Sequence, residues 1–256
     1  MSEPTAKEFR TWLEVFAGDL DLIFMNEVTD RIHRAVAAAL GKGWEVERRH
    51  NRPGSDEVLL AVRKSVGRVQ STRSLPMGGG RWIGRHTGRL HTARQMLEAC
   101  IDLDVVDLFA AVLHAPPSVD VEIKPATPRR RRGFGEGGLL GRVARRFTVL
   151  LGKADRVRAW RLYWRRFRRW ADGINRLGVP WVAGGDVQEP RTARGWTSPA
   201  DTAARVSGRS YLRGIDGWLA SRHVHVKDIE VHDPAPGGDH HVVTSTLVIP
   251  IRGGTA

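Results

Sequence analysis

The chain has 256 residues, of which 41% are hydrophobic and only one, Cys100, is a cysteine. This length can bury a sizeable core without disulfides or structural metals, and one cysteine excludes an internal disulfide framework. No apolar run approaches the ~18 residues that a membrane span needs, and the first residues lack the basic start and apolar block of a signal peptide. We therefore expect a cytoplasmic globular protein.

The positive charge is concentrated in one segment. The chain has 41 Lys and Arg against 28 Asp and Glu, and residues 129–170 hold 15 of the basic and 2 of the acidic ones, which leaves 26 of each elsewhere. Only 6 of the 41 are Lys, so 35 are Arg, the side chain suited to bidentate phosphate contacts. A localised basic block favours a polyanionic partner, above all nucleic acid, although a solvated face would have the same composition.

Apolar runs of strand length alternate with helical patterns, which predicts an α/β or α+β fold. In chain order we expect a helix over 9–16, a strand over 20–25, a helix over 28–40, strands over 44–49 and 57–62, a loop over 66–88, a helix over 92–100 and a strand over 105–113. We expect a single domain over residues 1–256, in which the Pro- and Arg-rich stretch at about 117–155 is an exposed, basic insertion.

An amphipathic helix is predicted after this insertion. Its apolar stripe, at spacings of three and four, is Val157, Trp160, Trp164, Phe167, Ala171 and Ile174. We expect the stripe to pack in the core and the intervening arginines to face solvent or a phosphate backbone. Strands are then expected over 180–184, 214–220, 223–231 and 242–250.

Acidic and imidazole side chains lie at the ends of the predicted strands. They are Glu27, His114, Asp186, Asp216, Asp239 and His240. Rigid strands can hold such groups while loops admit a substrate, and converging carboxylates suit Mg²⁺ or Mn²⁺. Two adjacent histidines could also indicate zinc, but neither an HExxH motif nor Cys/His ligand spacing accompanies them.

Six segments, in order, resemble the endonuclease/exonuclease/phosphatase superfamily, whose fold is that of deoxyribonuclease I. DLIFMNEV resembles the metal-ligand strand, VLLAVRK the following core strand and FAAVLHAPP the segment with a catalytic His. VAGGDVQEP is similar to the Gly-Asp-Phe-Asn motif, GIDGWLAS to the Ile-Asp-Tyr-Ile-Phe strand and GGDHHVV to the Ser-Asp-His motif. The resemblance implies a four-layer α/β/β/α sandwich of two packed mixed β-sheets.

The same resemblance implies metal-dependent hydrolysis of a phosphodiester. Glu27, with Asp239 nearby, would hold Mg²⁺ or Mn²⁺. Asp186 would orient or deprotonate the attacking water, and Gln188 would contact a phosphate oxygen or position that water.

Two histidines would act on the phosphate, and Asp216 would orient the imidazole of one of them, His240. His114 and His240 would contact the scissile phosphate and stabilise the transition state or protonate the leaving oxygen.

The basic segment favours a nuclease, with DNA favoured over RNA as the partner. The arginines expected to contact nucleic acid are Arg129, Arg130, Arg131, Arg132, Arg145, Arg146, Arg165 and Arg169. Two alternatives stay open: a catalytically weak or inactive nucleic-acid-binding protein of this fold, and a phosphatase or phospholipid phosphodiesterase of the superfamily.

The sequence departs from the family pattern twice. The family opens with a strand that carries an Asn of the metal and phosphate site, whereas this sequence begins at the helix that follows. We expect either a start site that is recorded too far downstream or a domain without this strand. Gln188 stands where the motif has Asn, which lengthens the amide by one methylene.

Overall fold

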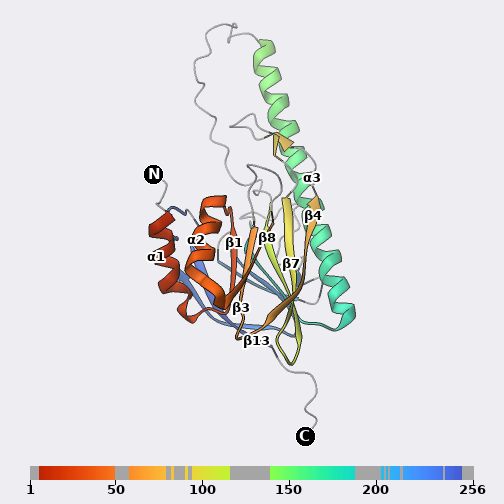
Figure 1. The fold of residues 1–256 in the computed structure, drawn as a ribbon. Helices are drawn as coiled ribbons and strands as arrows, with labels where there is room; N and C mark the ends of the chain where they lie inside the picture. Colours follow the sequence, from red (N-terminus) through yellow and green to blue (C-terminus); the bar gives the residue numbers. More distant parts are fainter. Residues whose placement is uncertain are drawn as a thin grey trace.

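The structure, a computed structural model, describes the following residues: 6–49, 58–78, 82–83, 90–91, 94–115, 139–187, 203–204, 206, 208–213, 216–238 and 240–249. The side chains of 78, 82–83, 90–91, 94, 139–157 and 212–213 are not described. Two β-sheet layers pack face to face, with helices on both outer sides (Figure 1). The four-layer α/β/β/α sandwich predicted from the sequence is confirmed. None of the described helices has the length and apolar character to cross a membrane.

One layer is a continuous six-stranded sheet in the order β10-β11-β9-β8-β7-β4. The pair β8–β9 is parallel and the other pairs are antiparallel, so this sheet is mixed as expected. Its strands are β4 (Arg68–Gly78), β7 (Arg94–Asp102), β8 (Asp107–His114), β9 (Trp181–Asp186), β10 (Gly208–Arg213) and β11 (Asp216–Ser221). Two short strands, β5 (Trp82–Ile83) and β6 (Leu90–His91), pair apart from it.

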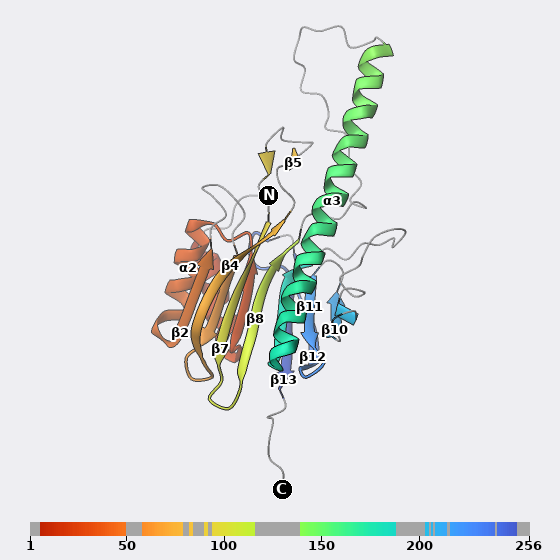
Figure 2. The same ribbon diagram turned by 90° about the vertical axis from the view of Figure 1, so that its right-hand side faces the viewer.

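The helix α3 (Leu139–Leu177) lies across the outer face of the six-stranded sheet, and its amino-terminal part extends beyond the sheet (Figure 2). Trp160, Trp164 and Phe167 are almost fully buried between helix and sheet. The expectation that the aromatic stripe belongs to the core is therefore confirmed for these residues. The stripe anchors the carboxyl-terminal half of α3, since each aromatic side chain of this kind buries 150–250 Å² or so.

Among the described residues, the second layer consists of two separate antiparallel sheets, whereas the sequence predicted a second mixed sheet. The order β1-β3-β2 joins β1 (Leu22–Asn26), β3 (Val58–Arg63) and β2 (Trp44–Arg49). The strands β12 (His225–His232) and β13 (Val242–Val248) form the other sheet. The 3₁₀ turns η1 (Ala17–Asp19) and η2 (Gly41–Gly43) precede β1 and β2.

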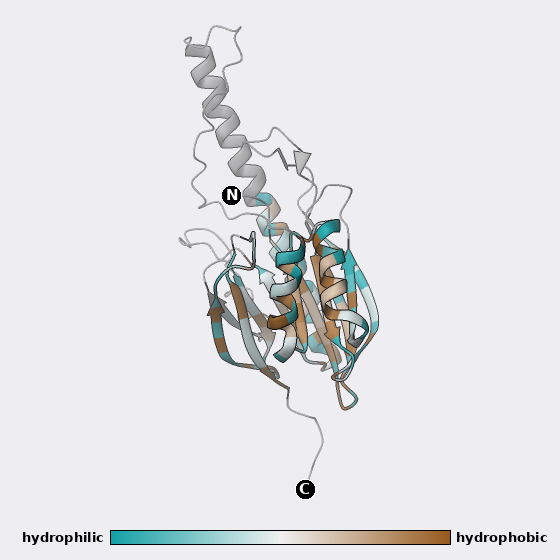
Figure 3. Cartoon of the chain, turned by 60° about the vertical axis from the view of Figure 1, so that its left-hand side comes forward, coloured by the Kyte–Doolittle hydropathy of each residue, from teal (hydrophilic) through white to brown (hydrophobic). Residues whose placement is uncertain are grey.

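The helices α1 (Ala6–Phe16) and α2 (Asp30–Leu40) cover the outer face of the three-stranded sheet. Hydrophobic and hydrophilic segments alternate along both helices, as expected when one face packs on a sheet (Figure 3). The hydroxyl of Thr29 accepts a hydrogen bond from the Ile32 N–H and so caps α2, which explains why the helix begins after Thr29 rather than at Val28.

Two elements expected from the sequence are wrong. Residues 68–78, expected as loop, form β4, and residues 94–102, expected as helix over 92–100, form β7. Met96, Leu97 and Ala99 of β7 are all fully buried, because both faces of this strand are covered. Such a strand has no alternation of apolar and polar residues, and tertiary burial outweighs the helix propensity of its Leu, Glu and Ala.

Candidate active site

Three acidic and imidazole groups lie side by side on adjacent strands of the six-stranded sheet. His114, at the end of β8, pairs with Asp186 at the end of β9, and Asp186 pairs with Asp216 at the start of β11. Val112, two residues before His114, and Val182, four residues before Asp186, lie in the core between the two layers. Side chains an even number of residues apart on a strand share a face, so His114, Asp186 and, opposite Asp186, Asp216 point toward the second layer.

Gly185 allows the second layer to approach this edge. Its φ of +122° lies in a region that glycine tolerates, and a Cβ there would lie 2.4 Å from the Leu113 carbonyl oxygen and 2.7 Å from Nδ2 of Asn26. The glycine before Asp186 is thus required by the close contact with the end of β1.

The second layer supplies the other two groups. Glu27 follows the last residue of β1 and His240 precedes β13. Nε2 of His114 lies 3.7 Å from Oε1 of Glu27 and 3.9 Å from Oδ2 of Asp186. His114 and Asp186 are buried, at 2% and 5% exposure, whereas the Glu27 side chain is 57% exposed. The imidazole of His114 therefore lies at the base of the site and Glu27 at its opening.

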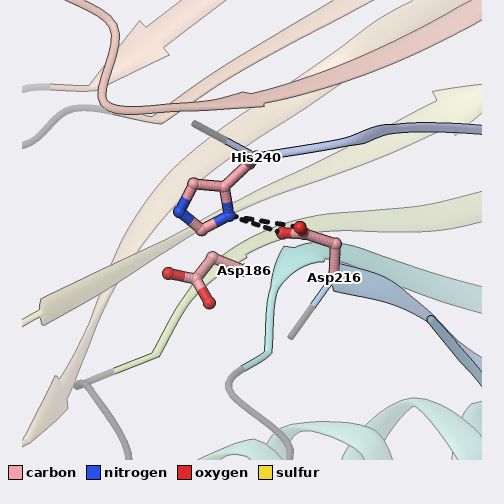
Figure 4. A group of neighbouring side chains, drawn as sticks. All are labelled: Asp186, Asp216 and His240. Carbon is pink, nitrogen blue, oxygen red and sulfur yellow. Dashed lines mark hydrogen bonds and ion pairs between the residues drawn. The ribbon is translucent and has the colours of Figure 1, made fainter. Parts of the chain in front are cut away.

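His240 and Asp216 form a hydrogen-bonded pair (Figure 4). Nδ1 of His240 lies 3.0 Å from Oδ1 and 3.1 Å from Oδ2 of Asp216. A carboxylate at one ring nitrogen fixes the orientation and tautomer of the imidazole. Nε2 is consequently directed away from Asp216 (Figure 4).

The site can hold a divalent cation. Asp186, Asp216 and His240 each offer one ligand atom, and these atoms lie within 4.8 Å of one another. Glu27 adds an exposed carboxylate next to this group through the shared contact with His114. Carboxylate oxygens are the ligands of Mg²⁺, and Mn²⁺ also accepts imidazole, so this donor set fits either ion.

Several residues expected in the site or the interface are not described. Gln188, Asp239 and the four arginines at 129–132 lie outside the described residues, and the side chains of Arg145 and Arg146 in α3 are also not described. Arg165 and Arg169 are exposed on α3. The structure thus brings together five of the seven residues expected to form the site: Glu27, His114, Asp186, Asp216 and His240.

Two residues near the site were missed by the sequence analysis. The Tyr163 hydroxyl, from α3, accepts a hydrogen bond of 3.1 Å from the His114 N–H and fixes the end of β8. Asn26, directly before Glu27, places its side chain against Gly185. Tyr163 lies beside the aromatic stripe but outside its spacing of three and four, so no sequence signal marks it. Asn26 lies inside the quoted segment DLIFMNEV.

The arrangement of layers and the strand-end site define the endonuclease/exonuclease/phosphatase fold. Among solved structures, the chain is similar to an endonuclease/exonuclease/phosphatase from Bacteroides vulgatus, with a TM-score of 0.57 and 14% identity over 96% of this chain and 91% of that one. It is also similar to a mannosyl-6-phosphatase from Bacteroides thetaiotaomicron, with a TM-score of 0.55 and 12% identity over 95% and 91%.

A third similar structure is D. rerio TDP2 complexed with a single-strand DNA product, with a TM-score of 0.57 and 10% identity over 95% of this chain and 91% of that one. No family model and no curated protein sequence matches the chain. At 10–14% sequence identity, these three similarities show that the fold is shared.

Proposed function

We propose that the protein is a Mg²⁺- or Mn²⁺-dependent phosphodiester hydrolase that cleaves nucleic acid, with DNA as the favoured substrate. The observation that carries this proposal is the Asp216–His240 pair, which lies beside the buried Asp186. An oriented imidazole and a neighbouring carboxylate are the groups that general acid–base hydrolysis requires.

The residues have distinct proposed roles. Asp186 orients the attacking water and accepts its proton. Asp216 holds His240 so that Nε2 contacts a phosphate oxygen, and His114 binds the phosphate from the opposite side. Hydrogen bonds from these imidazoles would strengthen as charge develops on the phosphoryl oxygens, so they would act mainly in the transition state.

Glu27 is the proposed ligand of the metal, together with Asp239. Glu27 and Asp186 each lie within 4 Å of the same imidazole nitrogen, so two carboxylates contribute negative charge to this part of the site and favour a cation there. Asp216 is already engaged with His240, which leaves Glu27 at the opening of the site as the better ligand. When bound, Mg²⁺ would supply positive charge against the phosphoryl oxygens.

The choice of nucleic acid over a small phosphate ester rests on the surface of α3. Arg158, Arg161, Arg165 and Arg169 are all exposed and recur every three or four residues, opposite the buried aromatic stripe. A row of arginines along one helix face is suited to a phosphate backbone. The single-strand DNA product bound to D. rerio TDP2 supports a nucleic-acid ligand on this fold.

A cleavage assay tests the proposal. We expect the protein to cleave linear duplex DNA with Mg²⁺ or Mn²⁺ and to stop when EDTA is added. Asp186→Ala and His240→Ala should each lower the rate by ~10²–10⁴-fold while DNA binding stays within a few-fold. The matched controls are Asp107→Ala, at the opposite end of β8 from His114, and His225→Ala on β12.

Full cleavage by Asp186→Ala and His240→Ala would contradict the site assignment. Single-stranded DNA, RNA and p-nitrophenyl phosphate in the same assay separate a deoxyribonuclease from a ribonuclease and from a monoester phosphatase. Hydrolysis of the monoester without cleavage of DNA or RNA would show a phosphatase instead.

A nucleic-acid-binding protein without hydrolytic activity is the second candidate. The observation in its favour is that, among the described residues, the second layer is interrupted, because Glu27 and His240 lie next to strands of two separate sheets. It predicts that the chain binds DNA, that no divalent metal elicits cleavage, and that Asp186→Ala changes nothing.

Binding through α3 has its own test. Arg165→Gln combined with Arg169→Gln should reduce the slope of log K against log salt by about 1.8, at ~0.9 for each lost duplex-phosphate contact. Arg10→Gln on α1 is the control, since Arg10 is exposed and pairs with Glu14. An unchanged slope in the double variant would show that these arginines only face solvent.

A further inference from the structure

The end of β8 at the candidate site is paired with a strand on one side only, among the described residues. The ladder between β7 and β8 ends at the pair Leu97–Val112, two residues before His114. On its other side β8 stays paired with β9, and the Ala115 N–H donates to the Asp186 carbonyl oxygen over 2.8 Å. Successive N–H groups of a strand point to opposite neighbours, so the His114 N–H points toward β7, where the ladder has already ended.

The hydroxyl of Tyr163 takes the place of the strand carbonyl that would otherwise bind this N–H. It accepts a hydrogen bond of 3.1 Å from the His114 N–H. Tyr163 belongs to α3, which crosses the end of β8 on the outer face of the six-stranded sheet (Figure 2). A buried backbone N–H requires an acceptor, and here a helix side chain supplies it. The His114 peptide is therefore tied to α3 rather than to β7.

The position of the Tyr163 hydroxyl is fixed by the packing of α3. Tyr163 is fully buried, and its ring packs edge-on against Trp164, with the ring centroids 5.3 Å apart. Trp160 and Phe167, on the neighbouring turns, are buried against the same face of the sheet. A ring enclosed in this way changes its rotamer only if its neighbours move as well. The hydroxyl thus provides a fixed point for the end of β8.

The place of the His114 imidazole follows from the place of its peptide. Nε2 lies 3.7 Å from Oε1 of Glu27 and 3.9 Å from Oδ2 of Asp186. Only the side-chain torsion angles separate this ring from the backbone, so a shift of the peptide would change both distances. Catalytic groups must be held to within ~0.5 Å of their productive geometry. The hydrogen bond to Tyr163 acts on the residue at the base of the site, where such a shift has the greatest effect.

We propose that Tyr163 is a positioning residue of the candidate active site and that it acts through the backbone of His114. Its hydroxyl approaches the His114 peptide from the α3 side of the sheet, whereas the imidazole lies on the opposite side, beside Glu27 and Asp186. The hydroxyl holds the peptide so that the imidazole can bind the phosphate. The kinetic part of this proposal rests on the proposed function, whereas its geometric part can be tested without catalysis.

The same helical turn carries arginines on its outer side. Arg161 and Arg165, two residues before and after Tyr163, are both exposed. A phosphate backbone that contacts these arginines would lie against the turn that holds the His114 peptide. The helix α3 therefore has two roles in this proposal, since one face contacts the nucleic acid and the other supports the site.

Tyr163→Phe tests the proposal, and Tyr211→Phe is the matched control. The chain has only these two tyrosines, and Tyr211, on β10, pairs with Trp218 rather than with a residue of the site. Phenylalanine keeps the ring and removes the hydroxyl. We expect Tyr163→Phe to lower kcat for DNA cleavage ~10-fold and to leave KM within about twofold, because a misplaced group slows turnover rather than binding. Tyr211→Phe should leave both constants unchanged.

A double-mutant cycle shows whether Tyr163 acts through His114. In a chain that carries His114→Ala, the further change Tyr163→Phe should alter kcat by less than about twofold, because no imidazole is left to be positioned. A second loss of ~10-fold in that background would overturn the proposal. A lowered Tm with an unchanged kcat in the single variant Tyr163→Phe would also overturn it, since Tyr163 would then only stabilise the fold.

Nuclear magnetic resonance of His114 provides a readout that does not depend on catalysis. The imidazole signal that His114→Ala removes belongs to this residue, and it should shift in Tyr163→Phe but not in Tyr211→Phe. The His114 amide should exchange with solvent ~10-fold faster or more in Tyr163→Phe, because its buried N–H loses its acceptor. If the unmodified chain cleaves no DNA, the proposed function fails, and these two signals still decide the positioning role. Imidazole and amide signals that are the same in Tyr163→Phe and in the unmodified chain would overturn the proposal.

Discussion

The two β-sheet layers support the candidate site in different ways. The six-stranded layer is continuous, and the pairing of β8, β9 and β11 fixes His114, Asp186 and Asp216 at one level. The other layer consists, among the described residues, of two separate sheets, and one site residue lies next to a strand of each. Three of the five site residues therefore have their positions set by backbone hydrogen bonds within one sheet, whereas the positions of the other two depend on how two separate sheets are held together.

The largest expected contrast is in core packing. Phe167→Ala should lower the free energy of unfolding by ~3–5 kcal/mol, since Phe167 is fully buried against Trp164, Trp170 and Trp181. Phe24→Ala in β1 of the divided layer should cost less than half as much because Phe24 is only partly buried. Urea unfolding of both variants measures the difference. Equal losses would mean that the divided layer is packed as tightly as the α3 side of the six-stranded sheet.

Substitutions at two glycines should give the next largest difference in the free energy of unfolding. Gly185→Ala should cost ~2–4 kcal/mol, because a φ of +122° strains any other residue and the new Cβ would meet the Leu113 carbonyl. Gly18→Ala, with nothing within 4 Å of its Cβ position, should change the stability by less than ~1 kcal/mol. Thermal and urea unfolding compare the two. A tolerated Gly185→Ala would show that the end of β1 can move away from β9.

The smallest expected effect concerns the reactivity of the Cys100 thiol. Burial raises the pKa of the Cys100 thiol, and the carboxylates of Asp107, Glu98 and Asp102 act in the same direction. The folded protein should therefore have less thiolate at a given pH, and the rate of alkylation by iodoacetamide should rise at higher pH than in the urea-unfolded chain. The same pH profile in both states would mean that β7, in the continuous layer, opens readily.

Much of the fold could be predicted because strand ends carry a recognisable order of motifs. The strands that bear Glu27, His114, Asp186 and Asp216 have apolar runs bounded by turn residues, and each was expected within a few residues of its observed bounds. β7 was not expected as a strand. Both of its faces are buried, so its sequence lacks the alternation of apolar and polar residues that indicates a strand.

The residues of the candidate site could be predicted from the sequence, but the contacts that hold them in place could not. Resemblance to family motifs indicated Asp216 and His240, whose side chains the structure places 3.0 Å apart. The hydrogen bond from the His114 N–H to Tyr163 joins residues 49 positions apart in the sequence. A local pattern contains no information on such a contact, since it depends on where α3 crosses the sheet.

Glu27 has a backbone conformation that few residues adopt. Its φ of +57° is in the left-handed region, where a residue other than glycine costs ~1–3 kcal/mol. Glycine would relieve this strain, yet it would remove the carboxylate at the opening of the site. Glycine would thus favour the stability of the fold, whereas the glutamate keeps a carboxylate at the site. A chain selected only for thermal resistance would be expected to lose Glu27 early.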